Sequence, residues 1–306
     1  STHSPMVRAE HLLRALLPLA LTACMNPHRT DPPEVHGHRG CRGLLPENTI
    51  PAFLHAAELG VDWIELDVVI SADGQVIVSH EPWMSHVICT DANGKAIEQE
   101  RERDQNIYRM TAAQIRAFDC GSLEHPRFPD QEQRRVHKPT LREVVEAIEE
   151  TAMTGGGQPG YNIEVKSDPA LYGSHQPKPV QLAAMVHATI DSLGITDRSI
   201  IQSFDPAVLM AMHAIDQDLV LALLVENDDG LEINLQRLNF TPAIYSPEFS
   251  KADGKLRVEL RDRGIQLVVW TVNEPADIKR MIALGVDGII SDYPDRVLNL
   301  IEEHRE

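Results

Sequence analysis

The chain has 306 residues, a formal net charge of −18, 42% hydrophobic residues and 5% aromatic residues. This composition is that of an ordinary globular protein, and it shows no bias typical of a disordered or fibrous chain. The negative charge argues against binding of nucleic acids or anionic membranes by bulk electrostatics, because those surfaces are recognised mainly through Lys and Arg. An anionic small substrate would need a bound cation and a few basic residues gathered at one place.

The first 34 residues differ from the rest of the chain. Arg8 and Arg14 precede an apolar run that ends at Cys24. The run is too short for a transmembrane helix, which needs about 20 apolar residues, and its order of basic, apolar and small residues is typical of a bacterial lipoprotein export signal. We therefore expect residues 1–5 to be a vector-derived remnant, Cys24 to be lipidated, and the protein to be an exported, periplasmic or cell-envelope lipoprotein. A short amphipathic helix is the alternative.

Beyond residue 34, short apolar runs alternate with helical stretches, the pattern of a parallel sheet covered by helices. The predicted strands are 35–38, 62–70, 76–80, 161–165, 199–203, 219–225, 243–246, 266–271 and 288–291. The predicted helices are 49–59, 141–150, 179–193, 206–215, 231–239, 256–263 and 276–284. The second and third strands are separated only by 71–75 with an Asp73-Gly74 turn, so they must form a hairpin, because parallel neighbours need a crossover of about a dozen residues. The remaining eight strands predict one TIM-type (β/α)8 barrel over 35–306.

The connection after the hairpin is longer than an ordinary loop. We predict that 81–137 is an inserted region or lid over the barrel mouth, because long segments in compact folds are usually functional or mobile. In an exported protein, Cys41, Cys89 and Cys120 would form at most one disulfide and leave one thiol. The spacing does not tell which pair forms, and three small buried side chains are the alternative.

Two predicted strands carry pairs of polar residues on one face. Alternate residues of a strand point to the same side, so Glu65 and Asp67 face together, as do Glu164 and Lys166. Like charges inside a barrel are costly unless a cation or basic partner compensates them. Three carboxylates form an all-oxygen site that suits one Mg²⁺ or Ca²⁺ ion. A salt bridge at the barrel rim is the alternative for each acid taken alone.

Two histidines are predicted to join these carboxylates. His38 and Arg39 end the first strand, at the face of a barrel where catalytic residues gather. The hairpin returns His80 to the side of Glu65 and Asp67. A more local role is predicted for 48–49, where the Asn and Thr side chains would cap the backbone donors at the start of a helix.

A series of ordered motifs resembles the signature of the glycerophosphodiester phosphodiesterase family from residue 38 onward. The motifs are His38-Arg39-Gly40, Pro46-Glu47-Asn48-Thr49, Glu65-Leu66-Asp67-Val68, Asp73-Gly74, Val76-Ile77-Val78-Ser79-His80, Asn162-Ile163-Glu164-Val165-Lys166, Gln202-Ser203-Phe204, Val269-Trp270-Thr271-Val272-Asn273 and Gly288-Ile289-Ile290-Ser291-Asp292. The resemblance implies a TIM-type barrel and a divalent metal ion held by Glu65, Asp67 and Glu164. It also places the two family histidines at His38 and His80. Glu81 stands where family members usually have Asp.

The resemblance implies hydrolysis of a small glycerophosphodiester to glycerol 3-phosphate and an alcohol. His38 and His80 would then be general acid and base, in an order that the sequence does not give. Arg39 and Lys166 would neutralise the phosphoryl oxygens. Further substrate contacts are predicted for three residues at strand ends, with core packing as the alternative for the two aromatic ones: Gln202, Phe204 and Trp270.

Two other functions fit the same residues. One is a related barrel phosphodiesterase that acts on lipids, of the phospholipase D or sphingomyelinase D type, or on other diesters. The other is a surface lipoprotein that binds phosphodiesters without catalysis, although such a module would not need both histidines and all three carboxylates. Apart from the predicted anchor at Cys24, the sequence indicates no membrane contact.

Overall fold

The computed structural model describes residues 31–305 of the chain. The predicted export signal, including Cys24, lies outside these residues. Within the described range, no helix combines the length and the apolar character that crossing a membrane requires.

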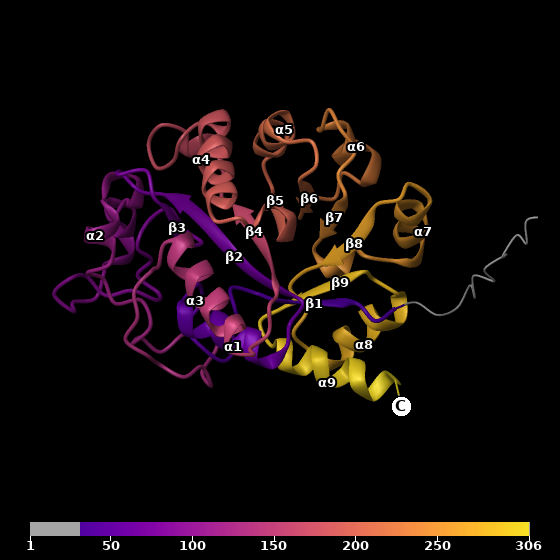
Figure 1. Cartoon of the computed structure of the whole chain (residues 1–306), viewed down its shortest axis with the longest axis horizontal. Helices are drawn as coiled ribbons and strands as arrows, with labels where there is room; N and C mark the ends of the chain where they lie inside the picture. The colour runs from indigo at the N-terminus through magenta and orange to yellow at the C-terminus, as the bar shows by residue number, and fades with distance from the viewer. Residues whose placement is uncertain (1–30, 306) are drawn as a thin grey trace, which may run out of the picture. The chain divides into compact units, whose positions relative to one another are not determined.

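Eight strands close into a parallel barrel, with helices around its outside (Figure 1). The strands of the barrel are β1 (Glu34–Gly37), β2 (Trp63–Ile70), β4 (Gly160–Val165), β5 (Ser199–Ser203), β6 (Val220–Val225), β7 (Ile244–Pro247), β8 (Gln266–Val269) and β9 (Gly288–Ser291). Each strand pairs in parallel with the next, and β9 closes the ring by pairing with β1. The predicted barrel with an extra hairpin strand is confirmed.

The extra strand, β3 (Val76–Val78), pairs antiparallel with the far end of β2. The near end of β2 pairs with β1 through His36 and Trp63, whereas its far end pairs with β3 through Val68 and Val78. Because β4 occupies the other edge of β2 over most of its length, β3 continues the β1 side of the barrel beyond the end of β1. The hairpin therefore stands above the barrel mouth.

The helices are α1 (Ile50–Leu59), α2 (Ala112–Ile115), α3 (Leu141–Met153), α4 (Pro179–Ser192), α5 (Pro206–Ile215), α6 (Leu231–Gln236), α7 (Gly254–Asp262), α8 (Pro275–Leu284) and α9 (Pro294–Arg305). Local sequence explains their starts. For example, Thr140 and Glu143 form a reciprocal capping box at the start of α3, and this helix buries residues at helical spacing against the barrel. Helix α9 is not among the predicted helices; it has Pro at its first position and buries Val297 and Ile301 on one face.

Apolar residues form separate layers inside and outside the barrel. The largest cluster fills the space between the strands and the surrounding helices. A smaller cluster lies on the inner faces of the strands and includes Ile200, Val268 and Ile290. A third lies beneath the segment that follows β3 and includes Met84, Ile107 and Ile115. The predicted insertion at 81–137 therefore covers an apolar cluster, which includes Val69 and Ile77 on the face of the β2–β3 hairpin that also carries Asp67.

The three cysteines in the described range have different states. Cys89 and Cys120 form a disulfide within the segment 81–137. Cys41 is a free thiol, completely buried, with its Sγ 3.4 Å from the backbone oxygen of Ala52. The spacing of the cysteines in the sequence does not identify this pair.

Candidate active site

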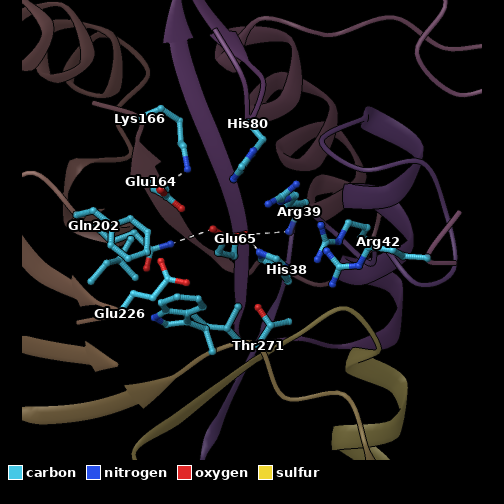
Figure 2. A pocket seen from close by; sticks show the side chains of 15 residues that line it. His38, Arg39, Arg42, Glu65, His80, Glu164, Lys166, Gln202, Glu226 and Thr271 are labelled. Atoms are coloured by element: carbon cyan, nitrogen blue, oxygen red, sulfur yellow. Dashed lines mark hydrogen bonds and ion pairs between the residues drawn. The ribbon is translucent and has the colours of Figure 1, made fainter. Parts of the chain in front are cut away.

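A cavity of about 500 Å³ opens at the barrel mouth, and most of the predicted site residues line it (Figure 2). His38 and Arg39 reach it from the end of β1, Glu65 from β2, Glu164 and Lys166 from β4 and the residue after it, and His80 from the loop that follows β3. The sequence-predicted members among its lining residues are His38, Arg39, Glu65, His80, Glu164, Lys166, Gln202, Phe204 and Trp270. Asp67, the remaining predicted residue, lies beside Glu65 on β2.

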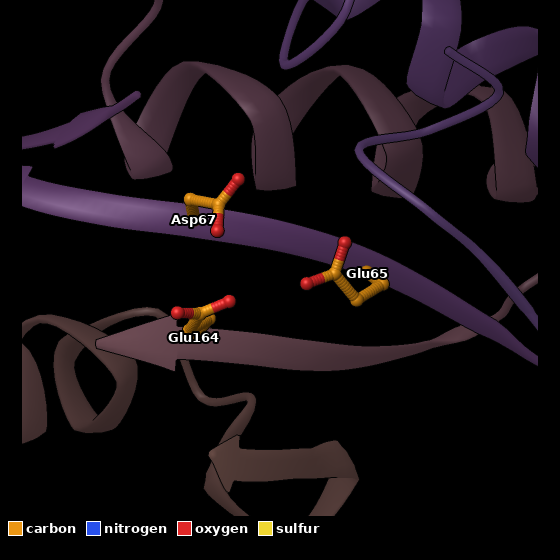
Figure 3. Close-up of side chains that lie close together, drawn as sticks. All are labelled: Glu65, Asp67 and Glu164. Atoms are coloured by element: carbon orange, nitrogen blue, oxygen red, sulfur yellow. The ribbon is translucent and has the colours of Figure 1, made fainter. Parts of the chain in front are cut away.

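Three carboxylates converge on the wall of this cavity (Figure 3). Asp67 and Glu164 are direct neighbours in the parallel pairing of β2 with β4, and Glu65 lies two residues before Asp67. One oxygen from each carboxylate lies within 4.8 Å of the others, and all three side chains are buried. The predicted convergence of Glu65, Asp67 and Glu164 is therefore present in the fold.

The electrostatics of this cluster fit a cation. Burial, followed by the charges of Asp67 and Glu164, raises the pKa of Glu65 well above its ordinary value. Burial also tends to raise the pKa of Asp67, but the charges of Arg39, His80 and Lys166 outweigh it and hold that pKa below its usual range. The Oδ1 atom of Asp67 is buried and has no hydrogen-bond partner among the described residues. An all-oxygen donor set with an unused buried oxygen suits a hard divalent ion, so the cluster could hold one.

Several other oxygens of the cluster accept hydrogen bonds from neighbouring donors. The backbone N–H of Arg39 donates to Glu65 Oε2 at 2.8 Å, and Gln202 Nε2 donates to Glu65 Oε1 at 2.9 Å. Lys166 Nζ donates to Glu164 Oε1 at 2.6 Å. The sequence predicts that Gln202 contacts the substrate. In the structure Gln202 lines the cavity, and its amide nitrogen orients a carboxylate of the candidate metal site.

Asn48 has a different role from the one predicted. The predicted helix cap is wrong for both 48 and 49, because Thr49 is the N-cap residue of α1 but its side chain makes no capping bond. Asn48 Nδ2 instead donates to Asp67 Oδ2 at 2.8 Å, and Asn48 Oδ1 accepts the backbone N–H of Asp67 at 3.3 Å. The buried carboxylate of Asp67 needs hydrogen-bond donors, whereas the start of α1 needs one acceptor fewer, because Pro51 in its first turn has no N–H group.

We expect Asn48→Ala to lower the affinity for a divalent ion about 10- to 100-fold, the usual effect of removing a residue that orients a metal ligand. Titration calorimetry with Mg²⁺ or Ca²⁺ would measure the change. Asn48→Gly is the matched control, because the φ of 55° at this position costs an alanine about 1–2 kcal/mol and costs glycine little. Both variants should lose affinity, but Asn48→Gly should remain more stable to urea. Unchanged affinity in both would contradict a role for Asn48 at Asp67.

His38 is held in one orientation by a carboxylate that was not assigned from the sequence. Its Nδ1 lies 2.6 Å from Asp292 Oδ1, so with Nδ1 protonated the ring donates to Asp292 and presents Nε2 toward Glu65, 3.9 Å away. Burial lowers the pKa of His38 to about 4, although the charge of Asp292 opposes this shift. Asp292 also accepts hydrogen bonds from Arg42 and Asn273. The ring is therefore neutral near pH 7 and fixed in position.

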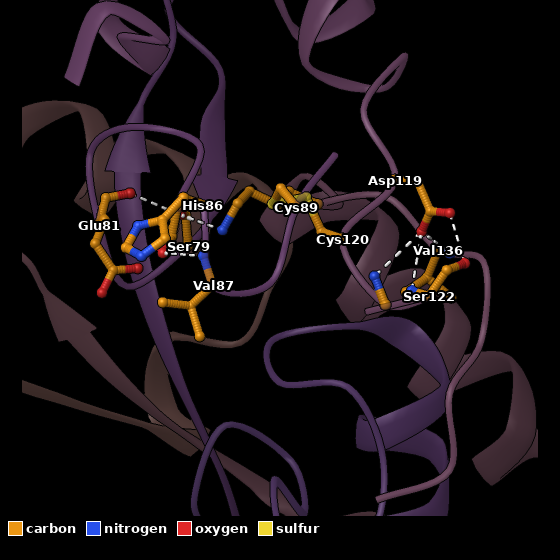
Figure 4. The surroundings of a disulfide bond; sticks show 12 residues. Ser79, Glu81, His86, Val87, Cys89, Asp119, Cys120, Ser122 and Val136 are labelled. Carbon is orange, nitrogen blue, oxygen red and sulfur yellow. Dashed lines mark hydrogen bonds between the residues drawn. A yellow bond between two sulfur atoms is a disulfide. The ribbon is translucent and has the colours of Figure 1, made fainter. Parts of the chain in front are cut away.

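His80 has a similar partner on its own loop. Its Nδ1 lies 2.7 Å from Glu81 Oε1, so Glu81, although longer than the usual Asp, still contacts the ring. The backbone N–H of Ser79 donates to the backbone oxygen of Asp67, and Ser79 Oγ donates to the backbone oxygen of Glu81. Lys138 Nζ donates to Ser79 Oγ from the other end of the insertion. Figure 4 shows Ser79 and Glu81 on the loop that leads into the disulfide-bonded segment. Both histidines thus have Nδ1 against a carboxylate.

Arg39 is a second residue whose partners were not predicted from the sequence. Its Nη1 lies 2.6 Å from Glu47 Oε1, and its Nε lies 3.3 Å from Asp67 Oδ2. Its φ is 50°, and Gly40 follows with a φ of 88°. These left-handed conformations turn the chain sharply after β1 and point the guanidinium back over the carboxylates. Glu47 is therefore part of the site through Arg39, and Arg42 lines the same cavity. In the sequence, only the motif around 46–49 indicated a role for Glu47.

The two predicted aromatic residues pack against each other at the cavity wall. The rings of Phe204 and Trp270 lie 5.4 Å apart, edge to face. The indole nitrogen of Trp270 donates to the backbone oxygen of Ser246 at 2.8 Å, whereas Phe204 is 39% exposed. Trp270 is therefore anchored to the barrel, and Phe204 presents apolar surface to the solvent beside Lys166.

Comparison with known proteins gives one consistent family. Residues 38–296 match the model of the glycerophosphoryl diester phosphodiesterase family. A glycerophosphodiester phosphodiesterase of Caldanaerobacter subterraneus is 30% identical over 275 residues, which cover 88% of this chain and 98% of the relative. A Bacillus altitudinis enzyme of the same name is 30% identical over 273 residues, with the same coverage.

Solved structures agree with the sequence relatives. A crystal structure from Silicibacter pomeroyi has 31% identity and a TM-score of 0.79, and the match covers 90% of this chain and 95% of that one. A phosphodiesterase from Oleispira antarctica has 23% identity and a TM-score of 0.68 over 89% of this chain and 97% of that one, which shows the same fold. Because the family match runs from His38 at the end of β1 into the last helix, we conclude that the chain belongs to the glycerophosphoryl diester phosphodiesterase family, as its motifs implied.

Proposed function

We propose that this enzyme hydrolyses glycerophosphodiesters to glycerol 3-phosphate and an alcohol, with one divalent cation held by Glu65, Asp67 and Glu164 and with His38 and His80 as acid and base. One observation carries the proposal. Two histidines, each with Nδ1 against a carboxylate, line the same cavity as Glu65 and Glu164, and the buried Asp67 converges with these two carboxylates. A module that only bound phosphodiesters would not need this combination.

The donor set suits Mg²⁺ or Ca²⁺, and such an ion supplies positive charge that stabilises a phosphoryl oxygen during displacement. The chain itself supplies further positive charge at the same place. Lys166 Nζ lies 2.6 Å from Glu164 Oε1 and 3.9 Å from Asp67 Oδ1, and Arg39 lies on the other side of Asp67. The ammonium of Lys166 and the guanidinium of Arg39 are positioned by these carboxylates before substrate binds. They therefore stabilise the charge that builds on the phosphate without having to move.

The histidines move the protons. With Nδ1 of each ring donating to Asp292 or Glu81, the two Nε2 atoms are the positions that can take a proton from the nucleophile and give one to the leaving alcohol. The fixed Nδ1–H bond keeps each ring in a single tautomer, which is the role of the carboxylate in other histidine-dependent hydrolases. His38 enters the site from the end of β1, and His80 enters it from the loop after β3. Such a pair can act on the two sides of phosphorus, one on the nucleophile and the other on the leaving group.

The comparisons support the substrate class. The two relatives that are 30% identical carry the name glycerophosphodiester phosphodiesterase, and the Oleispira antarctica structure was solved with the product sn-glycerol-3-phosphate.

Incubation with glycerophosphocholine, glycerophosphoethanolamine and glycerophosphoglycerol in the presence of Mg²⁺ or Ca²⁺ tests the proposal. We expect each to yield glycerol 3-phosphate, detected by coupling to glycerol-3-phosphate dehydrogenase. Release of a phosphorylated headgroup with free glycerol would place the cleaved bond on the other side of phosphorus. No turnover of any diester with any divalent ion would favour a binding protein.

A further inference from the structure

Four Lys and Arg side chains line the active-site cavity, and one of them differs from the other three. Arg39, Arg42 and Lys166 are each paired with a carboxylate, at distances of 2.6, 2.8 and 2.6 Å. Arg127, from the insertion, also lines the cavity, and among the described residues no carboxylate pairs with its guanidinium. Its positive charge is therefore available to a ligand in this cavity.

The turn that carries Arg127 is fastened to the barrel on both sides of this residue. Before it, the buried His125 accepts the backbone N–H of Arg127 on Nδ1 at 3.1 Å, and its Nε2 lies 3.7 Å from Glu47 Oε2. After it, the buried Gln131 donates from Nε2 to the backbone oxygen of Arg42 at 2.6 Å. Both anchor points on the barrel lie between β1 and α1. The backbone at Arg127 is therefore held close to the catalytic residues, although its side chain is exposed.

Phe128 positions the side chain of Arg127. Its ring is buried and packs edge-on against Tyr293. The guanidinium carbons of Arg42 and Arg127 lie 4.8 and 5.6 Å from the centroid of this ring. Contact with an aromatic ring attracts a cation and leaves its N–H groups unbonded. Arg127 therefore keeps its N–H donors for a carboxylate or a phosphate, the groups that a guanidinium binds best.

The opposite end of the cavity has the opposite charge. Arg42 follows β1 and Glu226 follows β6, and these two strands are four places apart in the eight-stranded ring, on opposite sides of the barrel. Figure 2 shows the two side chains on opposite sides of Glu65. Glu226 lines the cavity together with Phe204 and Trp270. A diester whose phosphate lies at the carboxylate cluster therefore extends one arm toward each end.

The two arms of a glycerophosphodiester differ in the charge that they can carry. The glycerol arm is neutral, and its hydroxyl groups can donate to a carboxylate such as that of Glu226. The alcohol arm varies between substrates, and it is the arm that can carry a carboxylate or a second phosphate. The chain has a formal net charge of −18 and repels anions in general, so the uncompensated guanidinium of Arg127 is a local exception. It matches an anionic alcohol arm better than it matches choline or ethanolamine.

We propose that Arg127 binds a carboxylate or a phosphate on the alcohol arm of the substrate, so that the enzyme prefers glycerophosphodiesters with a second anionic group. The inference rests on the function proposed above, and it assigns Arg127 as a substrate-binding residue supplied by the insertion. Because the anion lies on the leaving alcohol, the bond that breaks and the release of glycerol 3-phosphate are the same as for a neutral alcohol.

The test uses two matched pairs of substrates. Glycerophosphoserine differs from glycerophosphoethanolamine only by a carboxylate, and glycerophosphoinositol 4-phosphate differs from glycerophosphoinositol only by a phosphate. We expect the more anionic member of at least one pair to be preferred about tenfold in kcat/KM, the effect of a hydrogen bond to a charged group. All four substrates release glycerol 3-phosphate, so one coupled assay measures them on the same scale.

Two variants at one position locate the effect. Arg127→Gln should bring the ratio of kcat/KM in that pair close to one, and Arg127→Glu should reverse the preference, because like charges then meet at this end of the cavity. Arg135→Gln is the matched control. Arg135 is exposed on the same insertion, its substitution removes the same charge, and it does not line the cavity. Because both positions are exposed, the melting temperature should stay near that of the wild type in all three variants.

The outcomes separate this inference from the proposed function. A preference that Arg127→Gln removes and Arg135→Gln keeps supports the anion site, and the pair that shows it identifies the anion. The site is overturned if the wild type shows no such preference in either pair, or if Arg135→Gln has the same effect as Arg127→Gln.

Two other results would also overturn the anion site. One is an equal loss for both members of a pair in Arg127→Gln, because Arg127 would then bind the phosphate that they share. The other is a preference for ethanolamine or choline that Glu226→Gln removes, because the headgroup would then lie at the opposite end. In all these cases glycerol 3-phosphate is still released and the proposed function stands, whereas failure on every diester would overturn both proposals.

Discussion

His38→Ala and His80→Ala should each lower kcat for glycerophosphocholine by about 10²- to 10⁴-fold, the usual range for losing a general acid or base. Each ring presents Nε2 to the active-site cavity and is fixed through Nδ1 by Asp292 or Glu81, so no neighbouring side chain can replace it. KM should change much less than kcat. Steady-state release of choline over a range of substrate concentrations measures both constants.

The leaving group can distinguish the acid from the base. A substrate whose alcohol is p-nitrophenol leaves without protonation, so the variant that lacks the general acid should recover most of its rate on it, and the variant that lacks the base should not. His55→Ala is the matched control, because His55 lies on α1 and pairs with Glu58 away from the cavity. Wild-type turnover of glycerophosphocholine by either site variant would refute the assignment of acid and base.

Removal of divalent ions should abolish activity, and Glu65→Gln should prevent its recovery at ordinary ion concentrations. The substituted amide keeps the size of the native side chain and can still accept the N–H of Arg39. The new NH₂ group at position 65 can donate to Gln202 if the amide of Gln202 rotates. Its Oε1 is buried and has no partner in the described part of the chain, so it is free to accept. Activity after treatment with EDTA, followed by titration with Mg²⁺ or Ca²⁺, measures the effect.

The melting temperature provides a second measurement, in which Glu65→Gln should be an improvement and not a loss when no metal is bound. Without metal, Glu65→Gln removes one of three crowded buried carboxylates, so the metal-free variant should melt at a higher temperature than the metal-free wild type. With metal at about 100 times its Kd, the wild type should gain about 2.7 kcal/mol, and the variant should gain much less. Glu58→Gln, a substitution of an 82% exposed carboxylate on α1, should show neither effect. Activity of the wild type in EDTA equal to that with metal would refute metal dependence.

The barrel and the carboxylate cluster could be predicted because they follow from short-range rules. Strand periodicity placed Glu65 and Asp67 on one face, and the short 71–75 connection forced the hairpin that carries His80. Eight remaining strands then placed Glu164 at the same mouth. None of these steps required knowledge of a contact between distant parts of the chain.

The partners of these residues could not be predicted in this way. Asp292 reaches His38 across 254 positions, and this contact exists only because β9 closes the barrel against β1. Asn48 was misassigned because a local rule for helix starts was applied to a residue whose side chain satisfies a carboxylate 19 positions away. The partner of a buried polar group depends on which distant segments the fold brings together, and this cannot be deduced from spacing in the sequence.

The insertion leaves and rejoins the barrel at nearly the same point, since the backbone N–H of Val78 donates to the backbone oxygen of Pro139 at 2.8 Å. It also covers an apolar cluster and contains a disulfide, Cys89–Cys120, that spans 31 positions within it. A segment whose ends already meet can be exchanged for another of different length at little cost in chain entropy. Evolution or protein engineering can therefore vary the length of this insertion to change substrate preference, provided that the contacts of His125 with Glu47 and of Gln131 with Arg42 are kept.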